Sequence, residues 1–186
     1  MDIRRLFLFL LVFYVLPIGH GQKLPASSSS QPLLTKTPLT AEQNEIYGKF
    51  LDFRLSLNKG VINLSDRTFP INLSGPDLIP CLEGIEASNL GEARETVHLI
   101  SEDILKGRAV RLVNPNRNDI KEGLLSLSEI VFDKRHQFAV MSFTFSCSAP
   151  CGQGGPRTVV EAGTIVFEKR DNEWRQSKRY CPTWFS

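Results

Sequence analysis

Four cysteines are the residues of this chain with the clearest chemical role. They are Cys81, Cys147, Cys151 and Cys181. An even number of cysteines in a chain that leaves the cytoplasm is typical of disulfide bonds. Cys151 opens a glycine-rich turn in which the chain can double back. A small ring with Cys147 is therefore sterically feasible, and it would leave Cys81 to pair with Cys181.

Three alternatives remain for these cysteines: a crossed pairing, a four-thiolate zinc site and a redox-active CxxxC pair. Zinc sites favour the closer Cys-x-x-Cys spacing, and redox motifs usually have that spacing within a βαβ unit. We therefore expect structural disulfides, and neither a metal nor another cofactor. A bond between Cys81 and Cys181 would close a long loop, which is worth about 4–5 kcal/mol in the chain-entropy model.

Two histidines, His98 and His136, are the candidates for acid–base chemistry or metal binding. His98 has Glu95 and Glu102 at neighbouring helical spacings. His136 lies in a predicted turn of charged residues, where an exposed, solvated histidine is the simpler interpretation. No nucleophile elbow or HExxH pattern accompanies either one. We assign no catalytic residue, and we keep a hydrolase that uses one of these histidines with a carboxylate as the alternative function.

Cations and aromatic rings alternate near the end of the chain. They form a candidate ligand surface of Trp174, Arg175, Lys178, Arg179 and Tyr180. On a strand, Arg175 and Arg179 would share one face and the other three residues the opposite face. Such a surface can bind an anionic polymer or a glycan by charge and stacking. The alternative is a solvent-exposed sheet face whose aromatic residues anchor the edge of the core.

The hydrophobic pattern predicts the elements that position these residues. Thr40-Ala-Glu-Gln43 fits a capping box, and apolar residues at helical spacing predict a helix over residues 41–57. A short strand over 61–64, an irregular stretch to about 86 and a second helix near 89–99 follow. Four β-type segments separated by turns fill the C-terminal third. They are residues 124–132, 137–147, 158–168 and 174–181.

The second of these segments alternates in a way that is typical of a half-buried strand. One face carries Ala139, Met141, Phe143, Phe145 and Cys147, whereas serine and threonine occupy the other. The predicted fold class is therefore α+β. We expect a four-stranded antiparallel C-terminal meander that is covered by the amphipathic N-terminal helix and stabilised by disulfides.

The first residues predict export. Arg4 and Arg5 precede an apolar run from Leu6 to Ile18, and small residues follow at positions 19 and 21. The run is shorter than the ~20 residues that a membrane span needs. We predict a signal peptide over residues 1–21, a disordered Ser/Pro/Thr-rich linker over 22–39 and a single globular α+β domain over 40–186. The mature protein would be secreted or periplasmic, with no stable membrane span after cleavage.

Bulk charge argues against two classes of partner. Loss of residues 1–21 removes Arg4, Arg5 and Asp2, which lowers the formal net charge from +2 to +1. A near-neutral chain is atypical of a dedicated nucleic-acid or membrane-surface binder. We therefore expect no nucleic-acid partner.

Two Asn-Leu-Ser sequences, which begin at Asn63 and Asn72, are formal acceptors for N-glycosylation. They matter only if the source is a eukaryote.

Two C-terminal stretches carry a resemblance to other proteins. LSEIVFDKRHQFAV begins at Leu127 and leads to CGQGG, which ends at Gly155, and VFEKRDNEWR begins at Val166. Their order of strands and turns resembles a loosely defined group of uncharacterised secreted bacterial proteins. The resemblance covers residues 127–186, and an insertion between Pro156 and Gly163 departs from it. It implies export and a bacterial source, and it transfers no catalytic residue.

The leading hypothesis is a non-catalytic domain that binds a protein or an envelope polymer. It depends on the absence of a catalytic motif and on the alternating cations and aromatic rings near the end of the chain. The alternative is the small secreted hydrolase with His98 or His136. A third interpretation is a structural protein whose linker spaces the domain from another component.

Overall fold

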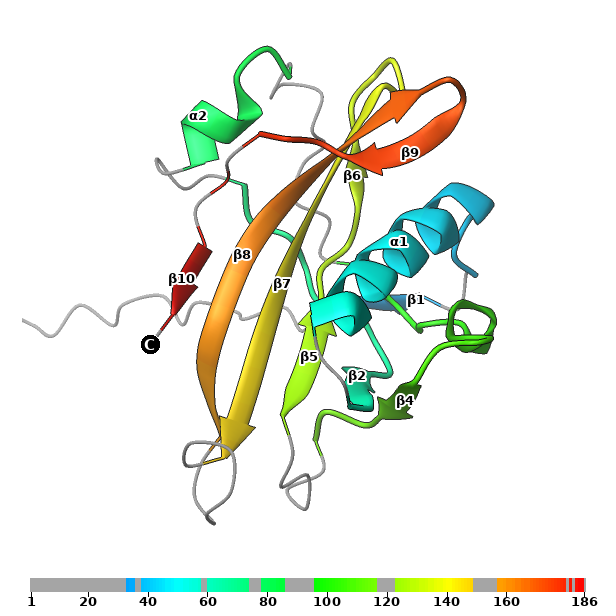
Figure 1. The fold of residues 1–186 in the computed structure, drawn as a ribbon, viewed down its shortest axis with the longest axis vertical. Coiled ribbons are helices and arrows are strands. Elements are labelled where there is room, and N and C mark those ends of the chain that lie inside the picture. The colour runs from blue at the N-terminus through cyan, green and yellow to red at the C-terminus, as the bar shows by residue number, and fades with distance from the viewer. Residues whose placement is uncertain are drawn as a thin grey trace, which may run out of the picture. The chain divides into compact units, whose positions relative to one another are not determined.

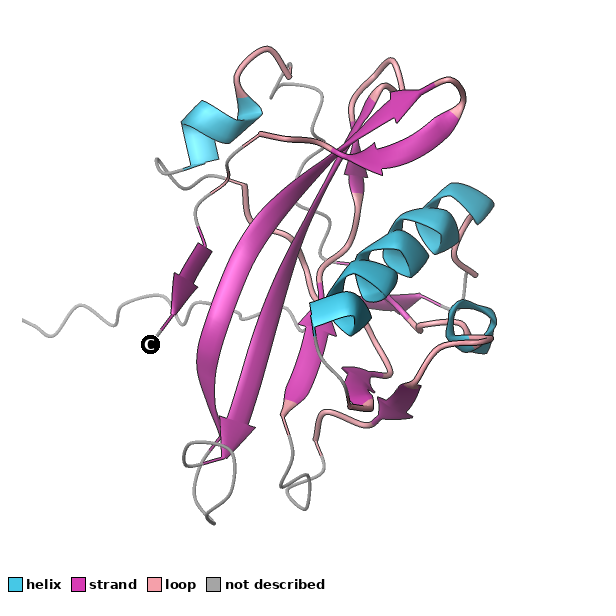
Figure 2. Cartoon of the chain, viewed as in Figure 1, coloured by secondary structure: helices cyan, strands magenta, loops and turns pink. Residues whose placement is uncertain are grey.

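The computed structural model describes residues 33–35, 38–57, 60–73, 78–85, 96–116, 123–148, 157–179, 181 and 183–185. The chain divides into two compact units, Met1–Ser30 and Gln31–Ser186, and every described residue belongs to the second. The predicted signal peptide and residues 22–32 of the predicted linker lie outside the described residues. The second unit is mixed α and β, with mostly strands and one long helix (Figures 1 and 2).

Helix α1 (Ala41–Leu57) has the predicted bounds, and its capping box is present. The backbone N–H of Gln43 donates to Thr40 Oγ1 at 3.2 Å, and the backbone N–H of Thr40 donates to Gln43 Oε1 at 2.8 Å. These two bonds satisfy donors that a helix start leaves without intrahelical partners. The helix therefore begins at a position that the sequence itself specifies.

The main sheet has the strand order β10-β8-β7-β5-β2-β4, with β6 paired to β7 and β9 paired to β8. A separate pair is formed by β1 and β3, and two short helical segments, α2 and η3, complete the fold. The bounds are β1 Leu33–Thr35, β2 Ile62–Ser65, α2 Ile79–Leu82, β3 Thr96–His98, η3 Glu102–Leu105, β4 Val110–Val113, β5 Leu124–Leu127, β6 Val131–Phe132, β7 Phe138–Ser148, β8 Arg157–Arg170, β9 Glu173–Gln176 and β10 Thr183–Phe185.

The predicted four-stranded meander is not confirmed. Strands β5, β7, β8 and β9 do pair antiparallel in chain order. The sheet continues beyond them, however, because β2 pairs in parallel with both β5 and β4, and β10 pairs with β8. The first predicted strand, residues 124–132, is divided into β5 and β6. The last, residues 174–181, is a strand only as far as Gln176.

Two further predictions are wrong for the residues that the structure describes. Leu33–Thr35 fall in the predicted disordered linker, yet they pair in parallel with β3, and Leu39 is buried in the core. Backbone pairing and burial of an apolar side chain order this part of the linker. Residues 96–98 fall in the predicted second helix but form β3, because β-pairing overrides the local helical spacing.

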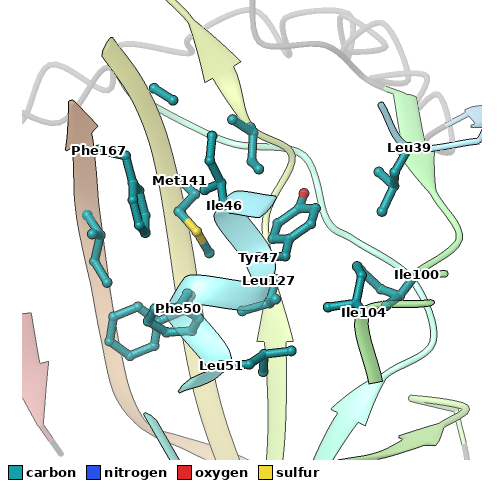
Figure 3. Packing of buried hydrophobic residues seen from close by; sticks show 14 of the residues in the cluster. Leu39, Ile46, Tyr47, Phe50, Leu51, Ile100, Ile104, Leu127, Met141 and Phe167 are labelled. Carbon is teal, nitrogen blue, oxygen red and sulfur yellow. The ribbon is translucent and has the colours of Figure 1, made fainter. Parts of the chain in front are cut away.

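The main core lies between α1 and the sheet. Helix residues Ile46, Tyr47, Phe50 and Leu51 are fully or almost fully buried. They pack with apolar side chains of β5, β7 and β8, and with Ile100 and Ile104 on another side (Figure 3). On β7, Ala139, Met141 and Phe143 belong to this cluster and Phe145 packs against it, as the alternation predicts.

A second apolar cluster occupies the other face of the sheet. Val140 on β7 and Val166 on β8 are direct register partners, and they alternate with residues of the main core. They pack with the region of α2 and with the disulfide between Cys81 and Cys181. The disulfide joins positions that are 100 residues apart, with a Cα–Cα distance of 4.9 Å. This is the pairing that the sequence favours.

Cys147 is buried at the end of β7 and is also disulfide-bonded. Cys151 lies outside the described residues. Among the described residues there is no free cysteine.

Candidate functional site

His98, the first candidate for acid–base chemistry, has Glu129 as its carboxylate partner. His98 Nδ1 lies 2.8 Å from Glu129 Oε2, and the backbone N–H of His98 donates to Glu129 Oε1 at 3.0 Å. The carboxylate partners predicted from the sequence were Glu95 and Glu102. Glu102 lies in η3, and Glu95 lies outside the described residues. A partner 31 positions away along the chain leaves no local sequence signal.

Thr68 completes this buried cluster. Its hydroxyl donates to Glu129 Oε1, and Thr68 Oγ1 accepts from the backbone N–H of His98 at 2.8 Å. The backbone N–H of Thr68 in turn donates to the carbonyl of His98 at 3.0 Å. Both Thr68 and Glu129 are 3% exposed. The carboxylate is therefore held by three donors from two segments, which joins the chain around residue 68 to β3.

Tyr47 on α1 lies beside this cluster. Its hydroxyl donates to the carbonyl of Ser128 at 2.8 Å. Complete burial, and then the nearby Glu129 carboxylate, raise the pKa of Tyr47 well above its usual value of 10.0. Tyr47 is therefore a neutral hydrogen-bond donor under ordinary conditions, and it ties α1 to the segment that follows β5.

The order of contacts in the cluster does not match nucleophilic hydrolysis. In a hydroxyl–imidazole–carboxylate triad, the imidazole lies between the other two groups and takes the proton from the hydroxyl. Here the Thr68 hydroxyl binds the Glu129 carboxylate itself. Thr68 is also buried, away from any substrate in solvent. The geometry supports a structural role for the His98–Glu129 pair.

His136, the second histidine, is exposed near the start of α1. Its Nδ1 lies 3.4 Å from Glu42 Oε2, and its ring stacks on Phe132 with 5.1 Å between centroids. Lys169 also donates to Glu42, at 2.6 Å. That hydrogen bond is the largest cause of the lowered pKa of Glu42. These contacts form a surface ion-pair network.

The basic and aromatic residues of the predicted ligand surface do not share one exposed face. Trp174 is 0% exposed and packs against Phe132, so its assignment to the surface is wrong. Arg175 and Lys178 are exposed, and Arg175 pairs with the neighbouring Glu173 at 3.3 Å. Tyr180 lies outside the described residues. The indole is buried because strand alternation directs position 174 inward, toward α1.

A cavity of about 320 Å³ lies at the edge of β8, beside the C-terminal half of α1. Strand β9 pairs with β8 from Phe167 onward, whereas β10 pairs with it only up to Gly163 (Figure 1). Residues 164–166 of β8 lie between these partners and line the cavity. The remaining lining residues are Phe50, Phe53, Arg54, Leu57, Phe143, Glu161, Gln176, Ser177, Arg179 and Cys181.

An ion pair forms part of the cavity wall. Arg54 on α1 donates to both carboxylate oxygens of Glu161 on β8, at 2.6 and 2.8 Å. The two side chains are only 12% and 16% exposed. The Arg54 guanidinium also lies over the Phe143 ring, 5.3 Å from its centroid. Bidentate pairs of this kind are geometrically specific, so the end of α1 is fixed against the start of β8.

Apolar side chains at the cavity are exposed to solvent. Phe53 is 41% and Leu57 is 61% exposed, although both belong to the apolar stripe that predicts the helix. Cavities of roughly 300–1,000 Å³ lined by apolar residues with a few placed polar groups are typical ligand sites. The sequence does not reveal this cavity, because its lining comes from four segments that are distant along the chain.

The geometry also bears on metal binding and on N-glycosylation. Among the described residues, no group of three or more His, Cys, Asp or Glu side chains could hold a metal ion.

Asn63 is 2% exposed, and its amide group binds the carbonyl of Gly123 and the guanidinium of Arg111. A glycan therefore has no access to Asn63 in the folded domain, whereas Asn72 is exposed.

No protein-family model, curated protein or solved structure matches this chain. The resemblance to secreted bacterial proteins accordingly stays a prediction. In the part of the chain that the structure describes, no helix is long and apolar enough to cross a membrane.

Proposed function

We propose that this protein is a non-catalytic binding domain that works outside the cytoplasm, secreted or periplasmic, and that its ligand enters the cavity between α1 and β8. The observation that carries the proposal is the cavity of about 320 Å³ with exposed Phe53 and Leu57 beside a fixed Arg54–Glu161 pair. The disulfide between Cys81 and Cys181 supports the extracytoplasmic location.

The size of the cavity favours a compact apolar group over the length of a polymer. A protein or an envelope polymer stays our prediction for the partner as a whole. Such a partner would place one of its apolar groups in the cavity. The predicted basic and aromatic surface no longer supports polymer binding by itself, because Trp174 is buried.

The hydrolase hypothesis has less support than binding. His98 does lie beside a carboxylate, but the cluster is closed and its hydroxyl binds the wrong partner for proton transfer. The cavity lining contains no histidine, and its only cysteine is in a disulfide. Binding requires no reactive group and uses the apolar lining directly.

Octanol is a suitable probe, because it has an apolar chain and an uncharged head. We expect octanol to shift the backbone amide signals of residues 164–166, Gln176 and Ser177 in an NMR titration of the oxidised mature protein. Replacement of both Phe53 and Leu57 by glutamine should weaken binding several-fold, since apolar burial contributes about 25 cal/mol per Å².

The matched control replaces two exposed apolar residues that do not line the cavity. Val61→Gln with Ile79→Gln removes side chains that are 61% and 69% exposed, which is comparable to Leu57. This variant should bind octanol like the unchanged protein. Amide shifts that are absent from the cavity, or equal losses in both double variants, would contradict the proposed function.

A further inference from the structure

Arg179 has an unusual position at the cavity, because only uncharged groups hold it. Its Nη1 donates to the carbonyl of Glu83, and a longer bond of 3.4 Å reaches the carbonyl of Cys81. The guanidinium lies over the Phe138 ring, 5.2 Å from the centroid. These contacts fix the side chain between α2, the residue after it and the start of β7, without neutralising its charge.

Other arginines of the same region contact a carboxylate. Arg54 pairs with Glu161, and Arg175 pairs with Glu173. Among the described residues, no carboxylate oxygen lies within 4.0 Å of the Arg179 guanidinium. Glu168 is near enough for Arg179 to contribute to its lowered pKa, but the hydrogen bond from Arg170 is the main cause of that shift.

The charges along the cavity therefore do not cancel. The lining contains Arg54, Arg179 and one carboxylate, Glu161, and that carboxylate already accepts two hydrogen bonds from Arg54. Arg179 therefore brings one positive charge without a carboxylate partner to a lining whose apolar residues include Phe50 and Phe143. A guanidinium in such surroundings attracts an anion more strongly than it would in bulk water.

We propose that the ligand of this cavity is an amphiphilic monocarboxylate, with its carboxylate at Arg179 and its apolar body against Phe50, Phe53 and Phe143. This inference rests on the proposed function and adds the charge of the ligand to it. An aliphatic chain and an aromatic ring both satisfy the apolar part. A carboxylate suits the site because guanidinium groups bind its two oxygens through paired hydrogen bonds.

The test compares probes with the same body and different heads. Octanoate, octanol and octylamine are titrated into the oxidised mature protein at neutral pH, and affinity is measured by calorimetry or amide shifts. We expect octanoate to bind about tenfold more tightly than octanol, because a hydrogen bond to a charged group adds that much. Octylamine should bind more weakly than octanol. Phenylpropanoate against phenylpropanol repeats the comparison with an aromatic body and distinguishes the two kinds of ligand.

Three variants assign the effect to Arg179. Arg179→Gln should reduce the affinity ratio of octanoate to octanol from about tenfold to about one, whereas Arg179→Lys should keep part of the preference. Arg175→Gln is the matched control, since it removes one positive charge from an exposed residue outside the cavity lining. It should keep the full tenfold preference.

The outcomes separate the two proposals. If octanol and octanoate both fail to shift the cavity signals, the proposed function itself fails. If both bind with equal affinity to the unchanged protein, the cavity binds ligands but the inference about the carboxylate is overturned. An equal loss of preference in Arg179→Gln and Arg175→Gln would also overturn it, because the effect would then be one of overall charge.

Discussion

Glu129 and Glu161 are two carboxylates with basic partners in two regions of the same fold, and their surroundings differ. The side chain of Glu129 is 4% exposed and accepts from Thr68 and from both the ring and the backbone of His98. The side chain of Glu161 is 16% exposed, accepts two hydrogen bonds from Arg54 and lines a cavity. Both carboxylates join segments that are far apart along the chain.

This difference distinguishes a carboxylate with a structural role, Glu129, from a carboxylate at the candidate binding site, Glu161. The side chain of Glu129 is buried and its oxygens bind donors of the protein, so its loss is expected to affect stability. Glu161 fixes α1 to β8 while leaving an adjacent space open. A buried histidine–carboxylate pair is therefore a poorer guide to function in this protein than a more ordinary arginine–glutamate pair beside an open cavity.

The largest effect is expected for Glu129→Ala. Removal of this acceptor leaves buried donors on Thr68 and His98 without it, which should lower the free energy of unfolding by about 3–5 kcal/mol. Urea unfolding monitored by circular dichroism measures the loss. Octanol should still bind to the folded fraction. A loss below about 1 kcal/mol would contradict the structural role of the cluster.

Glu161→Ala should have a smaller effect on stability and a larger one on binding. The pair is partly exposed, so we expect a loss of about 1–2 kcal/mol, between the values for surface and buried pairs. The two guanidinium donors that Glu161 now occupies would become available to a ligand carboxylate. Octanoate should therefore bind more tightly to this variant, while octanol affinity changes little. A decrease in octanoate affinity in calorimetry would show that Glu161 itself contributes to the site.

Tyr47→Phe tests the contact between α1 and the segment that contains Glu129. The variant leaves the buried carbonyl of Ser128 without this hydroxyl donor, which should cost about 1 kcal/mol. Thermal unfolding measures the change. Since the ring itself remains, octanol binding should be unaltered, and any weakening of it would mean that the two regions are coupled through α1.

The smallest effect concerns a surface carboxylate that belongs to neither region. The hydrogen bond from Lys169 lowers the pKa of Glu42 below its ordinary value of 4.5, so ionised Glu42 stabilises the fold at neutral pH. This contribution is lost as pH falls below 4.5 through the lowered pKa. The side chain is 34% exposed, so only a few tenths of a kcal/mol are expected. In Glu42→Gln, the difference in unfolding free energy between neutral and acid pH should shrink by that amount.

Local patterns predicted the local parts of this structure. The capping box of Thr40 and Gln43 lies within four residues and specified the start of α1, and alternation along β7 specified its buried face. The partners that define the two carboxylates are much farther apart. Glu129 lies 31 positions from His98, and Glu161 lies 107 positions from Arg54. No periodicity within a segment carries information about such contacts.

Strand β2 was predicted as a short strand over residues 61–64, but strand β4 and the parallel pairing of β2 were missed for a related reason. A parallel pair needs a long connection between its strands, so adjacent segments in the sequence give no sign of it. The cavity also depends on contacts between distant parts of the chain. It lies where β9 and β10 leave part of β8 without either strand as a partner. Sequence patterns could predict the fold class and the helix, but not the place where the sheet edge is open.

The disulfide between Cys81 and Cys181 has a consequence for the maturation of the protein. Cys181 lines the cavity, and Arg179, two positions earlier, donates to the carbonyl of Cys81. One covalent bond thus holds both the wall and the fixed cation of the site. Such bonds form and persist mainly in oxidising compartments. The reduced chain lacks this constraint. Under the proposed function, the chain would therefore become competent to bind when this disulfide forms.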